Sequence, residues 1–77
     1  MYNIALYENG VFCSNIGGSI ATLPEAIEQI KRISSTLRAE ELNGYFGYKF
    51  DRAGTTCALI VTDRMNFPIK NVENHEE

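Results

Sequence analysis

The chain contains few of the residues that catalytic and metal-binding sites require. Among its 77 residues there is one histidine, His75, there are two cysteines, Cys13 and Cys57, and there is no tryptophan. A nucleophile–base pair needs a base held in fixed geometry near the nucleophile, and a structural zinc site needs four close ligands. His75 belongs to a terminal segment that we expect to be mobile. The sequence therefore predicts a protein that is not an enzyme and that holds no metal ion or other cofactor.

An excess of charge of one sign is also missing from most of the chain. All seven Lys and Arg residues lie within residues 1–70, together with seven of the ten Asp and Glu residues, so the net charge of −3 comes from the last residues. Nucleic-acid binding needs a basic surface, and a DNA mimic needs a strongly acidic one. We expect neither, and we predict a single domain over residues 1–72 followed by an acidic, mobile tail over residues 73–77.

Long hydrophobic runs and charged leader segments are absent, which predicts no membrane contact and a cytosolic location. Cys13 and Cys57 lie in apolar, strand-like stretches, where reduced thiols serve as small buried side chains. A disulfide between them is the alternative. A chain of this length buries only about 60% of the surface that its unfolded form exposes. Self-association would therefore help its small core.

The first residues predict a β-hairpin. Residues 2–8, YNIALYE, alternate in polarity, and Asn9-Gly10 is typical of a two-residue type I′ turn, in which both residues need positive φ. The register of such a turn gives the pairs Tyr7 with Phe12, Leu6 with Cys13, and Ala5 with Ser14. We expect the second strand to end near Ile16, because Gly17-Gly18 follows. The turn thus places the Tyr7–Phe12 pair and the Leu6–Cys13 pair on opposite faces.

The next segment predicts an amphipathic helix. In Thr22-Leu23-Pro24-Glu25, the threonine and glutamate fit a capping box, and proline is tolerated in the first turn. One apolar stripe at helical spacing follows: Leu23, Ala26, Ile27, Ile30, Ile33 and Leu37. The stripe ends at Leu37, although the helix is free to continue as far as Asn43-Gly44, a typical stop.

The remaining segments predict further strands. Residues 45–50, YFGYKF, alternate between two faces, and residues 56–62, TCALIVT, form the most hydrophobic strand, which we expect at the centre of the sheet. Phe67-Pro68-Ile69 is expected as a short edge strand, since proline cannot sit inside a ladder. The elements follow the order ββαββ, an α+β domain in which one amphipathic helix packs on one face of an antiparallel sheet.

One helix covers only one face of a four-stranded sheet. We expect it to pack on Ile4, Leu6, Cys13, Phe46, Tyr48, Phe50 and one side of residues 56–62. The opposite face then carries Tyr7, Phe12, Ile16, Tyr45 and either Leu59 or Ile60. An aromatic face of this kind is typical of a partner site; the alternatives are that residues 64–72 cover it or that it closes a homodimer. RNA-binding sheets also expose aromatic residues, but Lys49 is the single cation expected beside these.

The opening stretch YNIALYENG resembles the segment NIAVYENG of a phage anti-CRISPR family that inhibits the type I-F surveillance complex. The resemblance covers about nine residues and implies an α+β build with an antiparallel sheet. In that family the tyrosine before Glu-Asn-Gly grips a subunit of the Cas backbone, a role that the resemblance gives to Tyr7. It implies a non-enzymatic inhibitor from a phage or mobile element that blocks a host defence complex sterically. The candidate partner-binding residues are Tyr7, Glu8, Phe12 and Tyr45.

A second segment suggests another class of protein. The predicted hairpin followed by Thr22-Leu23-Pro24-Glu25-Ala26-Ile27 is similar to the segment that opens the helix of HicB-like antitoxins. This likeness spans the first half of the chain and implies a homodimeric structural or regulatory partner protein, although no DNA-binding helix-turn-helix follows. A third possibility, a sponge for a small ligand or nucleotide, requires a pocket between the end of the helix and the sheet.

Overall fold

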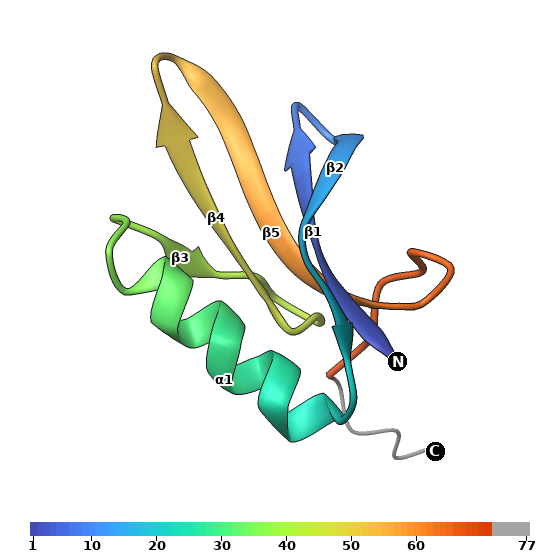
Figure 1. Ribbon diagram of the computed structural model, residues 1–77. Helices are drawn as coiled ribbons and strands as arrows, with labels where there is room; N and C mark the ends of the chain where they lie inside the picture. The colour runs from blue at the N-terminus through green and yellow to red at the C-terminus, as the bar shows by residue number, and fades with distance from the viewer. Residues whose placement is uncertain (72–77) are drawn as a thin grey trace, which may run out of the picture.

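The computed structural model describes residues 1–71 and consists of one helix and one antiparallel sheet (Figure 1). The elements are β1 (Tyr2–Glu8), β2 (Val11–Ile20), α1 (Leu23–Ser34), β3 (Glu40–Glu41), β4 (Gly47–Arg52) and β5 (Thr55–Asp63). The strand order is β2-β1-β5-β4-β3. The predicted α+β class is confirmed, with β5 central and one strand more than predicted. The expected tail, residues 73–77, and His75 lie outside the described residues.

Two tight turns join the long strands. Asn9 and Gly10 have φ values of 52° and 81°, and Ala53 and Gly54 have values of 52° and 82°. Positive φ at both central residues is the requirement of a type I′ hairpin turn, so the predicted first turn is confirmed. The second turn is tighter than expected from the sequence, because β4 runs to Arg52 before it.

Strand β2 differs from the prediction in register and in length. Tyr7 pairs with Phe12 as expected, but Leu6 pairs with Ser14, which leaves Cys13 as an extra residue in a bulge. The predicted pair of Leu6 with Cys13 is therefore wrong, and so is the expected burial of Cys13, which is exposed. The strand also continues through Gly17-Gly18 to Ile20, with two further register shifts.

The helix begins as predicted and ends early. The Thr22 hydroxyl accepts a hydrogen bond from the Glu25 N–H at 3.3 Å, the expected cap. At the other end, Ser35 Oγ donates to the Arg32 carbonyl and Thr36 Oγ1 to the Ile33 carbonyl, at 2.7 and 2.8 Å. Such local bonds offer the backbone an alternative to further helix. The continuation toward Asn43-Gly44 is therefore wrong, since β3 pairs with β4 there.

The core lies between α1 and one face of the sheet. Its buried members are Ile4, Ile20, Ala26, Ile30, Leu59 and Val61. The expected partners Leu6, Phe46, Tyr48 and Phe50 pack against this cluster and are partly buried. Because Leu59 faces α1, alternation along β5 places Ile60 on the opposite face.

Residues 64–71 run back along the end of β5. Thr62 forms a bridge with Pro68, and the Ile69 N–H donates to the Val61 carbonyl at 2.9 Å. The expected edge strand is thus reduced to isolated bridges, and Ile69 adds to the core. Within residues 1–71, the helix is too short and too polar to span a bilayer.

Candidate functional site

A row of directly paired residues crosses the whole sheet on the face opposite α1. Following the pairs from edge to edge, this transverse row consists of Phe12, Tyr7, Ala58, Lys49 and Glu40. Directly opposed residues on neighbouring strands project on the same side. Two residues of the row, Tyr7 and Phe12, are predicted site residues, and the structure brings them together as expected.

The first two members of the transverse row form an aromatic pair. The rings of Tyr7 and Phe12 meet edge to face, with centroids 5.9 Å apart and an interplanar angle of 77°. This geometry is a favourable one for aromatic side chains and contributes about 0.5–1.5 kcal/mol beyond the burial of area. Phe12 nevertheless keeps 43% of its surface exposed. The tight turn next to the pair holds two aromatic rings in a fixed arrangement at the surface.

The other end of the row carries opposite charges. Lys49 Nζ lies 3.9 Å from Glu40 Oε1, and both side chains are exposed. Surface pairs of this kind contribute little to stability, but this pair leaves the row without net charge. Glu40 was not among the predicted site residues, because the sequence pattern allowed it to continue the helix.

Between the two ends of the row runs a shallow groove of about 450 Å³ along β5. We call it the β5 groove; its main lining residues are Tyr7, Tyr45, Lys49, Ala58, Ile60 and Pro68. It forms because Ala58, on the central strand, is small, whereas Tyr7 and Lys49 on the neighbouring strands are large. Tyr45, predicted from the sequence, therefore shares this groove with Tyr7. Alternation in residues 56–62, combined with the strand register, is the signal that could have identified Ala58.

The alternative that residues 64–72 cover this face holds, within the described residues, for the end of the face near Thr62. Thr62 is fully buried beside Pro68, and its hydroxyl lies 3.4 Å from Asn66 Oδ1. Farther along β5, Ala58 and Ile60 are only half-buried. The uncovered part of the face is thus the part that contains the aromatic pair.

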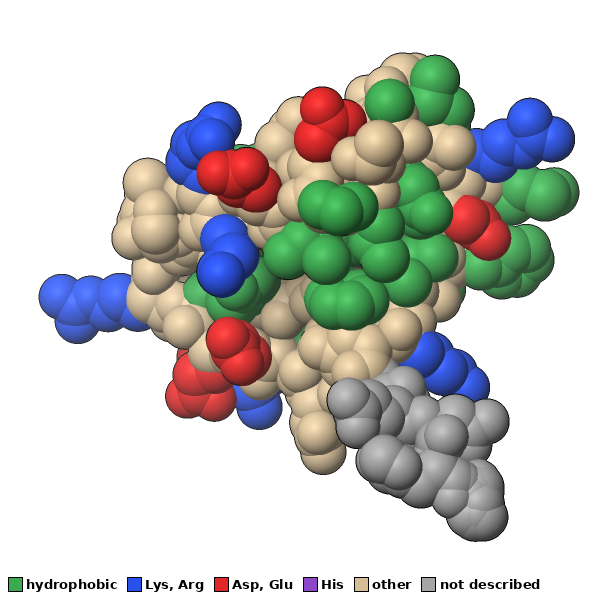
Figure 2. All heavy atoms as spheres, turned by 90° about the horizontal axis from the view of Figure 1, so that it is seen from below, with side chains coloured by type: hydrophobic (Ala, Val, Ile, Leu, Met, Phe, Trp, Pro, Cys, Tyr) green, Lys and Arg blue, Asp and Glu red, His purple; other side chains and the backbone are tan. Residues whose placement is uncertain are grey.

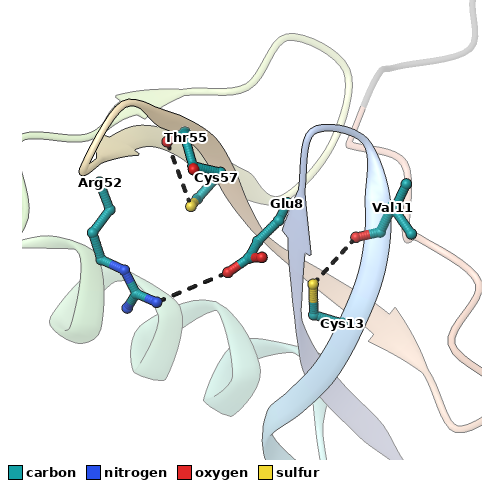
Figure 3. Close-up of polar contacts among 6 residues, drawn as sticks. All are labelled: Glu8, Val11, Cys13, Arg52, Thr55 and Cys57. Carbon is teal, nitrogen blue, oxygen red and sulfur yellow. Dashed lines mark hydrogen bonds and ion pairs between the residues drawn. The ribbon is translucent and has the colours of Figure 1, made fainter.

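Glu8 is separated from the other predicted site residues. It pairs with Cys57 on the side of the sheet that faces α1, and its carboxylate lies 3.9 Å from Arg52 Nη2. Figure 3 shows the Glu8 side chain between Arg52 and Cys13. Glu8 follows Tyr7 directly, so strand alternation sends the two side chains to opposite faces.

Both cysteines are free thiols. Strand β1 lies between β2 and β5, so the two Cα atoms are about 10 Å apart, which exceeds the reach of a disulfide. Cys57 is buried as predicted, whereas Cys13 donates a weak hydrogen bond to the Val11 carbonyl at 3.6 Å (Figure 3). Partial loss of hydration and the nearby Glu8 carboxylate both raise the pKa of the Cys13 thiol.

A second hollow lies between α1 and the start of β4. It has a volume of about 170 Å³, with Ile27, Phe46 and Tyr48 among its apolar lining residues and Lys31 and Glu41 among its charged ones. Figure 2 shows this end of the molecule, where a central hydrophobic area is bordered by charged side chains. The hollow occupies the place where a small-ligand sponge would need a pocket, but it is below the 300 Å³ or so at which ligand sites begin.

Within the described residues, no group of three or more His, Cys, Asp or Glu side chains is arranged to hold a metal ion. Comparisons with family models, with curated proteins and with solved structures found no match to this chain. The function is therefore inferred from the chain's own residues and their arrangement.

Proposed function

We propose that the protein is a non-enzymatic, cytosolic protein-binding module of a phage or mobile element. In this proposal it blocks a host defence complex sterically, through the sheet face opposite α1. The observation that carries the proposal is the Tyr7–Phe12 pair, two aromatic rings held edge to face at a surface that neither the helix nor residues 64–71 cover. The local resemblance to the type I-F anti-CRISPR family gives the same tyrosine a contact role.

The physical properties of this face suit a protein partner. Tyrosine is enriched among the few residues that dominate binding energy at interfaces, and its rigid ring loses little entropy on binding. The transverse row carries no net charge, because its single cation, Lys49, is paired with Glu40. A polyanion such as RNA would find no basic surface here. The backbone below Tyr7 is paired on both sides, with β2 and with β5, which holds the Tyr7 ring in place before binding.

The test is direct binding to a purified type I-F surveillance complex, measured by biolayer interferometry. Wild-type protein is expected to bind, and Tyr7→Ala and Phe12→Ala are each expected to weaken binding at least about tenfold. Phe67→Ala is the matched control, because Phe67 is 62% exposed and belongs to the loop after β5. Failure of the wild-type protein to bind would reject this target, and equal binding of all variants would reject the contact role of Tyr7.

A homodimer is the second candidate, and it is favoured by the composition of one sheet edge. Strand β2 runs for ten residues without a charged side chain, and nearly all of them are exposed. Natural sheets usually protect such edges with charges or proline, as the acidic β3 does at the opposite edge. Light scattering decides between a monomer and a dimer. If the protein is a dimer in which Tyr7 is no longer accessible to solvent, the homodimer would replace the first candidate.

A further inference from the structure

The β5 groove has walls, a floor and a length that together restrict what it can hold. Tyr7 and Lys49 flank Ala58 on either side, on strands about 10 Å apart. From Thr56 to Ile60 the floor extends for about 13 Å, at about 3.3 Å for each residue of a strand. The width and the length of the groove match one extended stretch of chain.

The floor of the groove has no free backbone groups to offer an incoming chain. Strand β5 lies between β1 and β4, and residues 57–60 pair with both neighbours. Just before them, the Thr56 carbonyl accepts a hydrogen bond from the Asn9 N–H at 2.8 Å. The N–H groups of an ordinary extended peptide that point at this floor would therefore find no free backbone acceptor there, at a cost for each one that loses its water. Addition of a further strand is a property of sheet edges, and this groove lies in the middle of the sheet.

Proline removes that cost, because it has no N–H and its ring is apolar. Proline-rich segments form the polyproline II helix, which needs no internal hydrogen bonds and rises about 3.1 Å per residue, so about four residues match the floor. Grooves lined with aromatic side chains are the usual receptors for such segments. Here Tyr7 and Tyr45 supply the rings, and the half-buried Ile60 supplies an apolar floor.

We propose that the β5 groove binds a proline-rich segment of the partner protein in the polyproline II conformation. The inference rests on the proposed function, because it takes this face as the contact surface for a protein, and it adds the chemical class of the segment that is recognised. The charge pattern at the rim agrees with it. The Lys49–Glu40 pair is exposed and neutral, so it neither requires nor repels a charge in an uncharged proline segment.

The experiment is a titration of isotope-labelled protein with a capped deca-proline peptide, followed by backbone amide shifts. The expected result is saturable shifts centred on Ala58, Ile60 and Tyr7, and none with a glycine–serine peptide of equal length. Tyr45→Ala is expected to weaken the binding at least about tenfold, whereas Phe67→Ala leaves it unchanged. Ala58→Arg, which fills the floor, is a second test that spares both tyrosines.

The possible outcomes separate this inference from the proposed function. Absence of shifts at millimolar peptide, or shifts that lie outside the groove, would overturn the proline inference. If Tyr7→Ala still weakens binding to the surveillance complex in that case, the function stands and the partner uses a helix or a hairpin instead. If deca-proline binds in the groove but the complex does not, the groove assignment stands and the proposed target is wrong.

Discussion

Gly47 lies where the structure leaves no room for a side chain. It opens β4 and pairs with Ile60. A Cβ atom placed on Gly47 would lie 2.5 Å from the Leu59 carbonyl oxygen and 2.9 Å from Leu42 Cδ1. The Leu42 methyl group can move, but the Leu59 oxygen belongs to the backbone of the central strand. We therefore expect Gly47→Ala to push β4 away from β5.

The size of the effect follows from two opposing contributions. Overpacking of a close contact lowers the free energy of unfolding by about 1–3 kcal/mol. Replacement of glycine by alanine raises it by about 0.4–1 kcal/mol, because alanine restricts the unfolded chain. The expected net loss is about 1–2 kcal/mol in the free energy of unfolding. For a domain of this size, that corresponds to a decrease of about 5–15 °C in the melting temperature.

Gly17→Ala is the matched control. A Cβ atom at Gly17 would lie 3.4 Å from Ile4 Cδ1, which is an ordinary van der Waals contact. Alanine in a strand is favoured over glycine by about 0.5–1 kcal/mol, so this variant is expected to equal or exceed the wild type. Urea unfolding followed by circular dichroism measures both variants. The reasoning is refuted if Gly47→Ala unfolds within about 0.5 kcal/mol of the wild type, or if the two variants lose equal stability.

Two further predictions concern the helix cap and the exposed thiol. Thr22→Ala removes the acceptor for the Glu25 N–H and is expected to cost about 1 kcal/mol in urea unfolding, whereas Thr22→Ser keeps it; equal stability of the two variants would contradict the cap. Because a raised pKa lowers the thiolate fraction at a given pH, native Cys13 is expected to react with Ellman's reagent more slowly than the same thiol in urea. Glu8→Gln removes the neighbouring carboxylate and should increase the native rate, with Cys57 unreactive in both proteins because it is buried; an unchanged rate would show that Glu8 does not act on the thiol.

Several parts of the candidate site are readable from short stretches of sequence. The pair of Tyr7 with Phe12 follows from Asn9-Gly10, because a two-residue turn leaves only one register beside it. The face of Tyr45 follows from the alternation of residues 45–50. The position of Glu8 on the opposite face follows from the alternation of residues 2–8, which also separates Glu8 from Tyr7.

What the sequence by itself determined is local chemistry: the first turn, the Thr22 cap and the apolar stripe of α1 depend on residues only a few positions apart. The tertiary structure alone decided the bulge at Cys13, the pairing of β3 with β4 and the β5 groove. A bulge depends on how β2 follows the twist of β1, and the groove depends on strands that are distant in the chain. Forming such pairings costs the entropy of loop closure and is stabilised by contacts across the whole sheet. A short window of sequence contains neither the distant partner strand nor the length of the loop that must close.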